Sequence, residues 1–196
     1  AIDITEQKQT ETQLKEAEKI LHGFYTIASE TDQNLDTFLQ RILEMGQKQY
    51  GTEIGILAKI QEETYEVVAS QVLQGFPFSI KAGYTTDIKQ TYCSETIKKN
   101  EPITIEVAGN SEWQNHPAYA QTFFKLETYI GCRVMVEGKV YGTISFASPY
   151  PKSEPFKESD RQILKLMAQW VGNQIERYSS KAALKNNIKH ILLHKR

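Results

Sequence analysis

The spacing of hydrophobic residues changes several times along the chain, and each change predicts a different element of secondary structure. Residues 5–30 contain no proline and place apolar side chains alternately three and four positions apart. Those side chains are Leu14, Ala17, Leu21, Phe24 and Ala28. This spacing predicts a helix with one narrow apolar stripe, which is either the seam of a coiled coil or a face packed on the chain's own domain.

A second helix is predicted after the polar break at residues 31–34, because the apolar positions that follow have the spacing of a face buried on a core. Either Asp32 or Asn34 can cap its first turn, and Gly51 is expected to end it. From residue 54 the spacing shortens and β-branched residues become frequent, which predicts strands.

Two β-hairpins are predicted. The first pairs Ile54–Ile60 with Tyr65–Leu73, and the second pairs Thr128–Val136 with Lys139–Ala147 across the Glu137-Gly138 turn. Shorter elements are expected between them: a helix over 90–98, a strand over 103–107, a polar loop over 108–117 and an aromatic helix over 118–125.

A long helix is predicted from about Phe156, and its apolar pattern resumes after Ser179-Ser180. Local hairpins favour an antiparallel sheet with helices packed on its faces. We therefore predict an α+β fold with a central sheet of five or six mainly antiparallel strands and helices on both faces. This domain is expected over residues 33–178, between an N-terminal signalling helix (1–32) and a C-terminal linker helix (179–196).

Charge and hydropathy narrow the class of protein further. The 23 basic and 24 acidic residues are interleaved and leave a net charge of −1, which gives no electrostatic reason to expect a nucleic acid partner. No apolar stretch approaches the roughly 18 residues that span a bilayer, and the first residues are polar. Cys93 and Cys132 match no disulfide framework or zinc spacing. These features predict a cytoplasmic location without membrane insertion, and reduced thiols.

The most specific sequence motif lies in the second hairpin, where Thr128-Tyr129-Ile130-Gly131 precedes Tyr141-Gly142-Thr143-Ile144-Ser145-Phe146. Together with Thr91-Tyr92-Cys93-Ser94, this motif resembles a GAF domain of a bacterial multidomain sensor histidine kinase of cyanobacterial type. Lys157 departs from the family, which more often has a Thr or Ser cap there. Asp3-Ile4-Thr5-Glu6-Gln7-Lys8 resembles the exit signature of a PAS domain, which implies such a domain upstream.

The resemblance implies a function class without naming a ligand. Members of the family bind cyclic nucleotides, bilins, haem or small metabolites, or bind nothing and act as dimerising spacers. Covalent attachment of a bilin is not expected, because Asn115-His116-Pro117 lacks the cysteine that attacks the chromophore in bilin-binding relatives. The Asn-Lys-x-Phe-Asp-Glu element of the cyclic-nucleotide branch is also missing. The cofactor is therefore unknown.

The expected ligand pocket combines aromatic contact area with polar histidine and tyrosine tips. Its candidate residues are Tyr92, Cys93, Trp113, His116, Tyr119 and Tyr129. Phe123 and Phe124 are expected to pack in a helix that covers the sheet. No metal site is expected, because His190 and His194 lack the glutamate of an HExxH motif.

We expect a non-catalytic sensory module that binds an unknown small molecule or relays a conformational signal through a helical homodimer. Other sensor and kinase domains of the same chain are the implied partners. Two copies are expected to associate through residues 5–30 and 160–196. The expected seam residues are Leu14, Leu21, Phe24, Met167, Val171 and Tyr178. Two alternatives stay open: a cysteine-dependent enzyme similar to free methionine sulfoxide reductase, and a ligand-free spacer.

Overall fold

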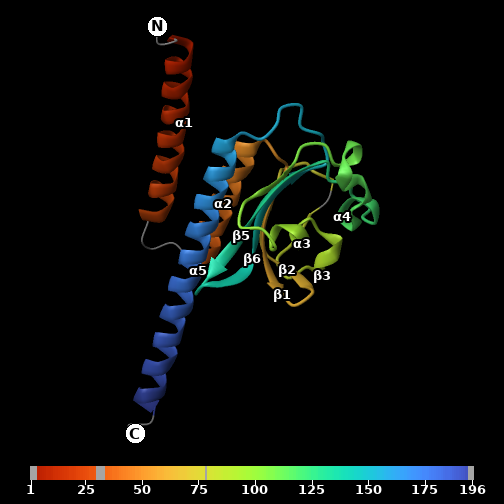
Figure 1. Ribbon diagram of the computed structural model, residues 1–196. Coiled ribbons are helices and arrows are strands. Elements are labelled where there is room, and N and C mark those ends of the chain that lie inside the picture. Colours follow the sequence, from red (N-terminus) through yellow and green to blue (C-terminus); the bar gives the residue numbers. More distant parts are fainter. Residues whose placement is uncertain (1–3, 30–33, 78, 194–196) are drawn as a thin grey trace.

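An antiparallel sheet of six strands lies at the centre of the fold, which the computed structural model describes for residues 4–29, 34–77 and 79–193 (Figure 1). The strand order is β3-β2-β1-β6-β5-β4. The strands are β1 (Ile54–Gln61), β2 (Thr64–Val72), β3 (Thr85–Asp87), β4 (Ile103–Ile105), β5 (Thr128–Val136) and β6 (Lys139–Ser148). Every neighbouring pair is antiparallel, which confirms the predicted α+β class.

Both predicted hairpins are confirmed. β1 pairs with β2 along its whole length, and β5 pairs with β6 across a two-residue turn. Glu137 and Gly138 in that turn have φ values of 50° and 74°, which suit the right-handed twist of the flanking strands. β3 was not predicted, because three residues are too few to show an alternation. It is held by its pairing with the start of β2.

The helices divide between the two faces of the sheet. α2 and α5 cover one face, α1 lies outside these two helices, and short helical turns lie over the other face (Figure 1). The helices are α1 (Ile4–Ser29), α2 (Leu35–Tyr50), α3 (Cys93–Thr96), α4 (Pro117–Ala120) and α5 (Glu158–Leu193). Single 3-10 turns are η1 (Ile88–Gln90), η2 (Ala108–Asn110) and η3 (Glu112–Asn115).

Both ends of α2 follow the sequence expectation. The side chain of Asn34 accepts a hydrogen bond of 2.8 Å from the backbone N–H of Thr37, which satisfies one of the free donors in the first turn. Gly51 ends the helix in the left-handed conformation, with φ at 64°. Asp32, the other candidate cap, lies outside the described residues.

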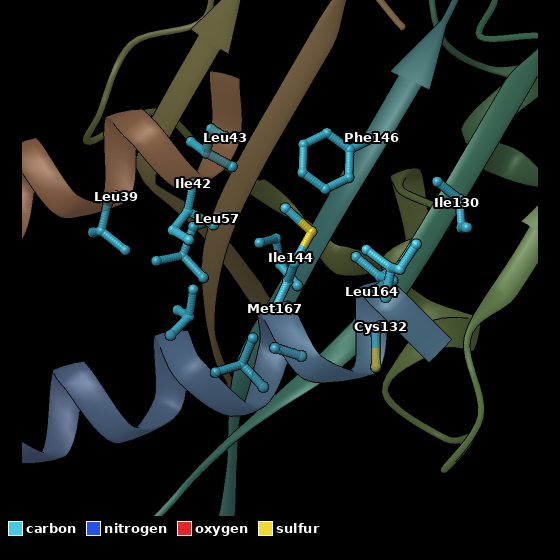
Figure 2. Close-up of a cluster of buried hydrophobic side chains, with 14 of the residues drawn as sticks. Leu39, Ile42, Leu43, Leu57, Ile130, Cys132, Ile144, Phe146, Leu164 and Met167 are labelled. Atoms are coloured by element: carbon cyan, nitrogen blue, oxygen red, sulfur yellow. The ribbon is translucent and has the colours of Figure 1, made fainter. Parts of the chain in front are cut away.

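The larger hydrophobic core fills the space between the sheet and helices α2 and α5 (Figure 2). Ile144 and Phe146 of β6 and Leu164 of α5 are fully buried in it. Gly46 on α2 leaves room for the Phe146 ring, since a Cβ atom there would lie 2.0 Å from the ring's Cζ atom. Close approach of α2 to the sheet therefore depends on a residue without a side chain.

Met167 and Val171 belong to this core and do not face a partner molecule. Both side chains are 0% exposed, because the first half of α5 packs on the sheet. This part of the predicted dimer seam is wrong. A core face and a dimer face have the same helical period, so spacing alone did not separate them. Tyr178 is half-buried further along α5, and the side chain of Phe24 lies outside the described part of the chain.

α1 packs on the domain through one stripe and leaves a second stripe exposed. Ile20 and Ile27 are partly buried against the core of α2 and α5. Leu14 and Leu21, both predicted seam residues, are 60% and 48% exposed. Consecutive helical positions are about 100° apart, so the two stripes are neighbours on the helix surface. Both interpretations of this helix therefore stay compatible with the structure.

α5 continues without a break through Ser179 and Ser180, where the sequence pattern is interrupted. Its 36 residues give a length of about 54 Å. Figure 1 shows α1 extending beyond the domain at one end and α5 at the opposite end. Leu184 and Ile188 on the extending part of α5 are 61% and 49% exposed. None of the described helices combines the length and apolar character that crossing a membrane requires.

Candidate functional site

The sheet face opposite α2 and α5 holds a second hydrophobic cluster and a cavity of about 750 Å³. The floor of the cavity comes from the strands, and its lining there includes Ile56, Tyr65, Val67, Tyr129, Ser145 and Ala147. Segments 79–81, 90–93 and 121–124 contribute to its walls. This volume lies within the range of small-molecule sites in proteins, which is about 300–1,000 Å³.

Alternate residues of β6 serve the two faces of the sheet. Ser145 and Ala147 line the cavity, whereas Ile144 and Phe146 lie in the core beneath α2 and α5. This follows from the strand period of two, which points successive side chains to opposite faces. The cavity is therefore separated from the helix-bearing core by the thickness of one sheet.

A small hydrogen-bonded network lies at the base of the cavity. The Thr143 hydroxyl donates to the Cys93 sulfur at 3.1 Å, and the Tyr129 hydroxyl lies 3.5 Å from the same sulfur. The Tyr129 hydroxyl is also 2.7 Å from the Thr96 hydroxyl. Burial raises the pKa of the Cys93 thiol, and the hydrogen bond from Thr143 offsets only part of this effect. Cys93 is therefore a neutral, packed thiol and a poor nucleophile.

Three of the predicted pocket residues, Tyr92, Cys93 and Tyr129, line the cavity together. Trp113 and His116 do not line it and instead support the Tyr92 ring from behind. Their ring centroids lie 5.7 and 5.5 Å from that of Tyr92. These distances are typical of packed aromatic pairs, so the two residues position a pocket wall that they do not form.

His116 is fixed in a neutral form by its surroundings. Its Nδ1 atom accepts a hydrogen bond of 3.1 Å from the backbone N–H of Ala118, which caps the short helix α4. Its Nε2 atom lies 3.4 Å from the Ser94 hydroxyl. Partial burial lowers the pKa of His116, which favours the uncharged ring. The side chain thus has a structural role at the base of the cavity wall.

Tyr119, another predicted pocket residue, points to Glu127 and does not line the cavity. Its hydroxyl donates to the Glu127 carboxylate at 2.5 Å, and the same carboxylate accepts the backbone N–H of Gly109 at 2.8 Å. This hydrogen bond to Glu127 raises the pKa of Tyr119. Glu127 therefore ties segment 108–120 to the start of β5.

The model of the family described as "GAF domain" matches residues 34–175, which is well over half of the chain. The chain belongs to the GAF family. No curated protein matches it.

Several solved structures share this GAF fold at low sequence identity. One is the GAF domain of a phosphoenolpyruvate-protein phosphotransferase from Acinetobacter, which is 17% identical to this chain with a TM-score of 0.64. The match covers 86% of this chain and 95% of that domain. Free methionine-R-sulfoxide reductase from Neisseria meningitidis is 13% identical with a TM-score of 0.60, and the match covers 82% of this chain and 89% of the reductase chain. A domain named as part of a two-component sensor histidine kinase from Sinorhizobium meliloti is 16% identical with a TM-score of 0.54, and the match covers 76% of this chain and 97% of that domain. At these identities the likeness establishes the fold alone.

The GAF cavity is also lined by residues that the sequence did not assign to the pocket. Tyr65 on β2 and Lys81 in the loop before β3 line it, as do Phe123 and Phe124. The two phenylalanines were expected to pack as a helix on the sheet, and this expectation is wrong. Phe123 is 92% exposed at the edge of the cavity, because α4 ends at Ala120 and the chain continues as a loop. The alternation along β2 could have indicated Tyr65, but no local pattern marks Lys81.

The two cysteines of the GAF domain lie on opposite faces of the sheet. Cys93 is in the cavity-side cluster, and Cys132 is in the core against α5. Burial raises the pKa of the Cys132 thiol to about 11. The part of the chain that the structure describes contains no group of three metal-ligating side chains. The side chain of His190 and all of His194 lie outside that part.

Proposed function

We propose that this GAF domain is the sensory module of a two-component signalling protein, which binds a small molecule in the cavity and passes the binding event to α5. The observation that carries the proposal is the shared use of the sheet. Strands β5 and β6 supply cavity-lining side chains on one face and core side chains beneath α5 on the other. A ligand that shifts these strands therefore acts on the surface that holds the helix.

Close contact between α5 and β5 supports a direct mechanical coupling. A Cβ atom at Gly172 would lie 2.2 Å from the carbonyl oxygen of Met135, so helix and strand approach backbone to backbone there. Such a contact leaves little freedom for one element to move without the other. Signalling of this kind requires two positions of α5 relative to the sheet. The ligand can shift the equilibrium between them only as far as its affinities for the two states differ.

The proposed output route is a homodimer of parallel helices. Leu14 and Leu21 on α1, and Leu184 and Ile188 on α5, are exposed apolar side chains at helical spacing. A second copy of the chain would cover them, and the opposite projections of α1 and α5 would place domains before and after this module along one axis (Figure 1). The resemblance to sensor histidine kinases implies a PAS domain upstream and a kinase downstream.

The described site gives no support to the enzyme alternative. A reductase of this fold needs cysteines that can reach one substrate, and Cys93 and Cys132 are separated by the sheet. Both thiols are also held neutral by burial. We therefore assign no catalytic residue.

Native mass spectrometry of the purified protein tests the proposal, with Ala147→Phe as the variant that fills the cavity. Ala147 lines the cavity, so the added ring should displace a ligand and abolish its co-purification. Ala182→Phe is the matched control, because Ala182 lies on the exposed part of α5. We expect a bound small molecule in the wild-type and control proteins only.

Hydrogen exchange of the same samples tests the coupling. Ligand release should increase amide exchange in β5 and β6 and also in the first half of α5, because this part of the helix packs on the two strands. A wild-type protein without bound mass, whose melting temperature no metabolite mixture raises, would contradict a sensory role. A bound small molecule whose release leaves amide exchange in α5 unchanged would restrict the role of the domain to ligand binding.

A further inference from the structure

The cavity of the GAF domain has an unusual charge balance among its described lining residues. Lys81 is the only charged side chain there, and no carboxylate faces the space. The other lining side chains are aromatic, aliphatic, or neutral with hydroxyl, thiol or amide groups. A ligand cation would therefore have no counter-charge, whereas a ligand with one anionic group would have one partner.

Lys81 is held at the cavity by a loop that is tied to β2 on both sides. The Ser70 hydroxyl donates to the carbonyl of Ile80, just before Lys81. Just after it, the N–H of Gly83 donates to the Val67 carbonyl at 2.8 Å. The Lys81 ammonium has no hydrogen-bond or ion-pair partner in the part of the chain that the structure describes, and its side chain is exposed. The backbone on both sides of Lys81 is thus held on β2, and the ammonium group is free to bind a ligand.

Tyr65 supplies a second, independent indication of a ligand. The residue is 95% buried, being only 5% exposed, and it lines the cavity. No described residue accepts or donates a hydrogen bond to its hydroxyl, although the neighbouring hydroxyls of Tyr129, Thr96 and Thr143 are all paired. Among the described residues, the fully enclosed side-chain polar atoms without a partner are Thr52 Oγ1 and Glu53 Oε2, so the Tyr65 hydroxyl reaches the open space of the cavity, where a ligand atom can accept its hydrogen bond.

Aromatic rings surround the space between these two polar groups. Tyr92 and Tyr129 contribute buried rings whose centroids are 5.2 Å apart. Phe123 and Phe124 add exposed rings at the edge, stacked edge to face at 5.1 Å. Ring faces give most contact area to a flat apolar body, and exposed rings become buried when such a body is bound.

We infer that the cavity binds an aromatic monocarboxylic acid, with the carboxylate at Lys81 and the ring system between the tyrosine and phenylalanine side chains. This inference rests on the proposed sensory function and names the ligand class of the same site. A phosphorylated ligand fits less well, because phosphate sites gather several N–H donors or cations and this cavity offers one ammonium group. The Tyr65 hydroxyl would donate to a polar atom of the ring system or to the carboxylate.

The test is calorimetric titration of the full chain with three probes of nearly the same shape. They are naphthalene carboxylic acid, the neutral naphthalene carboxamide and the cationic naphthylmethyl ammonium ion. We expect the acid to bind at least about tenfold more tightly than the amide, since one charge-assisted hydrogen bond is at stake, and the ammonium ion not to bind. Displacement of any co-purified molecule before titration keeps the site accessible.

Two pairs of variants assign the contacts. Lys81→Met should reduce the affinity for the acid to that for the amide, while Lys139→Met, at the exposed second hairpin, should leave it unchanged. Tyr65→Phe should weaken binding by about fivefold without loss of thermal stability, because its hydroxyl has no partner to lose. Tyr141→Phe, outside the cavity lining, is the control for that change.

The outcomes separate the ligand class from the sensory function. Equal binding of acid and amide, or an acid affinity that Lys81→Met does not change, would overturn the inference while leaving a ligand-binding cavity. Tighter binding of the ammonium ion would overturn it as well. If none of the three probes binds but native mass spectrometry finds another bound molecule, the aromatic acid is excluded and the sensory function stands.

Discussion

At the scale of single residues, burial acts on the two cysteines in the same direction although they face opposite sides of the sheet. Cys93 has its pKa raised, and Cys132 has a pKa of about 11 against an ordinary value of 9.0. At about pH 8 the folded protein should therefore hold only on the order of one thiolate in a thousand at Cys132. Both thiols should resist alkylation and disulfide exchange in the native state.

Reaction with an aromatic disulfide that releases a coloured thiolate measures this resistance. We expect slow reaction of the folded protein, with a rate that rises with pH up to about 11, and rapid reaction of both thiols in urea. The unfolded chain loses these protons at lower pH than the folded chain. Stability should therefore fall as the pH rises from about 9 to 11. A fast native phase near neutral pH would contradict the buried positions of both cysteines.

At the scale of elements, the contact between α5 and β5 decides whether the helix follows the sheet. Gly172→Ala should lower the free energy of unfolding by about 1–3 kcal/mol, because the methyl group meets the Met135 carbonyl and pushes the helix outward. The same change raises helix propensity by about 1 kcal/mol, so the sign of the measured effect shows which term dominates. Urea unfolding followed by circular dichroism gives both the midpoint and the slope.

The neighbouring position supplies the control for that experiment. Asn173 is exposed on α5, and Asn173→Ala should gain roughly 0.5 kcal/mol from helix propensity alone. A stabilised Gly172→Ala protein would mean that α5 can separate from β5 without cost. In that case the strand movement proposed for signalling would not reach the helix.

At the scale of the whole molecule, the exposed stripe of α1 predicts association of two chains. Leu14→Lys combined with Leu21→Lys should raise the dimer dissociation constant about a hundredfold or more, because two charges would replace apolar side chains at the seam. Analytical ultracentrifugation measures the change. Thr12→Lys with His22→Lys adds the same side chains on another side of α1, where both residues are exposed, and should leave the dimer intact. A dimer that tolerates Lys at both leucines would exclude this seam.

The fold could be predicted from the sequence where local chemistry and tertiary structure agree. The Glu137-Gly138 turn and the Asn34 cap act on their immediate neighbours, so a short window of sequence contains their cause. Met167 was misassigned because one helical stripe serves a core or a partner equally well. Which of these it serves depends on where the sheet lies.

The cavity was only half predictable for a similar reason. Tyr92 and Tyr129 were found because their motifs mark the inner strand and its neighbour. Trp113 was placed in the pocket because it is aromatic, but the structure uses it to hold Tyr92 in position. The place of Lys81 at the cavity could not be predicted, because hydrogen bonds to β2 set the position of its loop and the local sequence does not indicate them.

The alternation along β6 has a consequence for how such modules diversify. Changes at Ser145 and Ala147 alter the shape of the cavity, and changes at Ile144 and Phe146 alter the core under the helices. Alternate positions of this one strand therefore determine ligand preference and thermal stability separately. During evolution, substitutions at the cavity-side positions can change the ligand that is recognised. The unchanged core-side positions then preserve the packing of the helices, and with it the output.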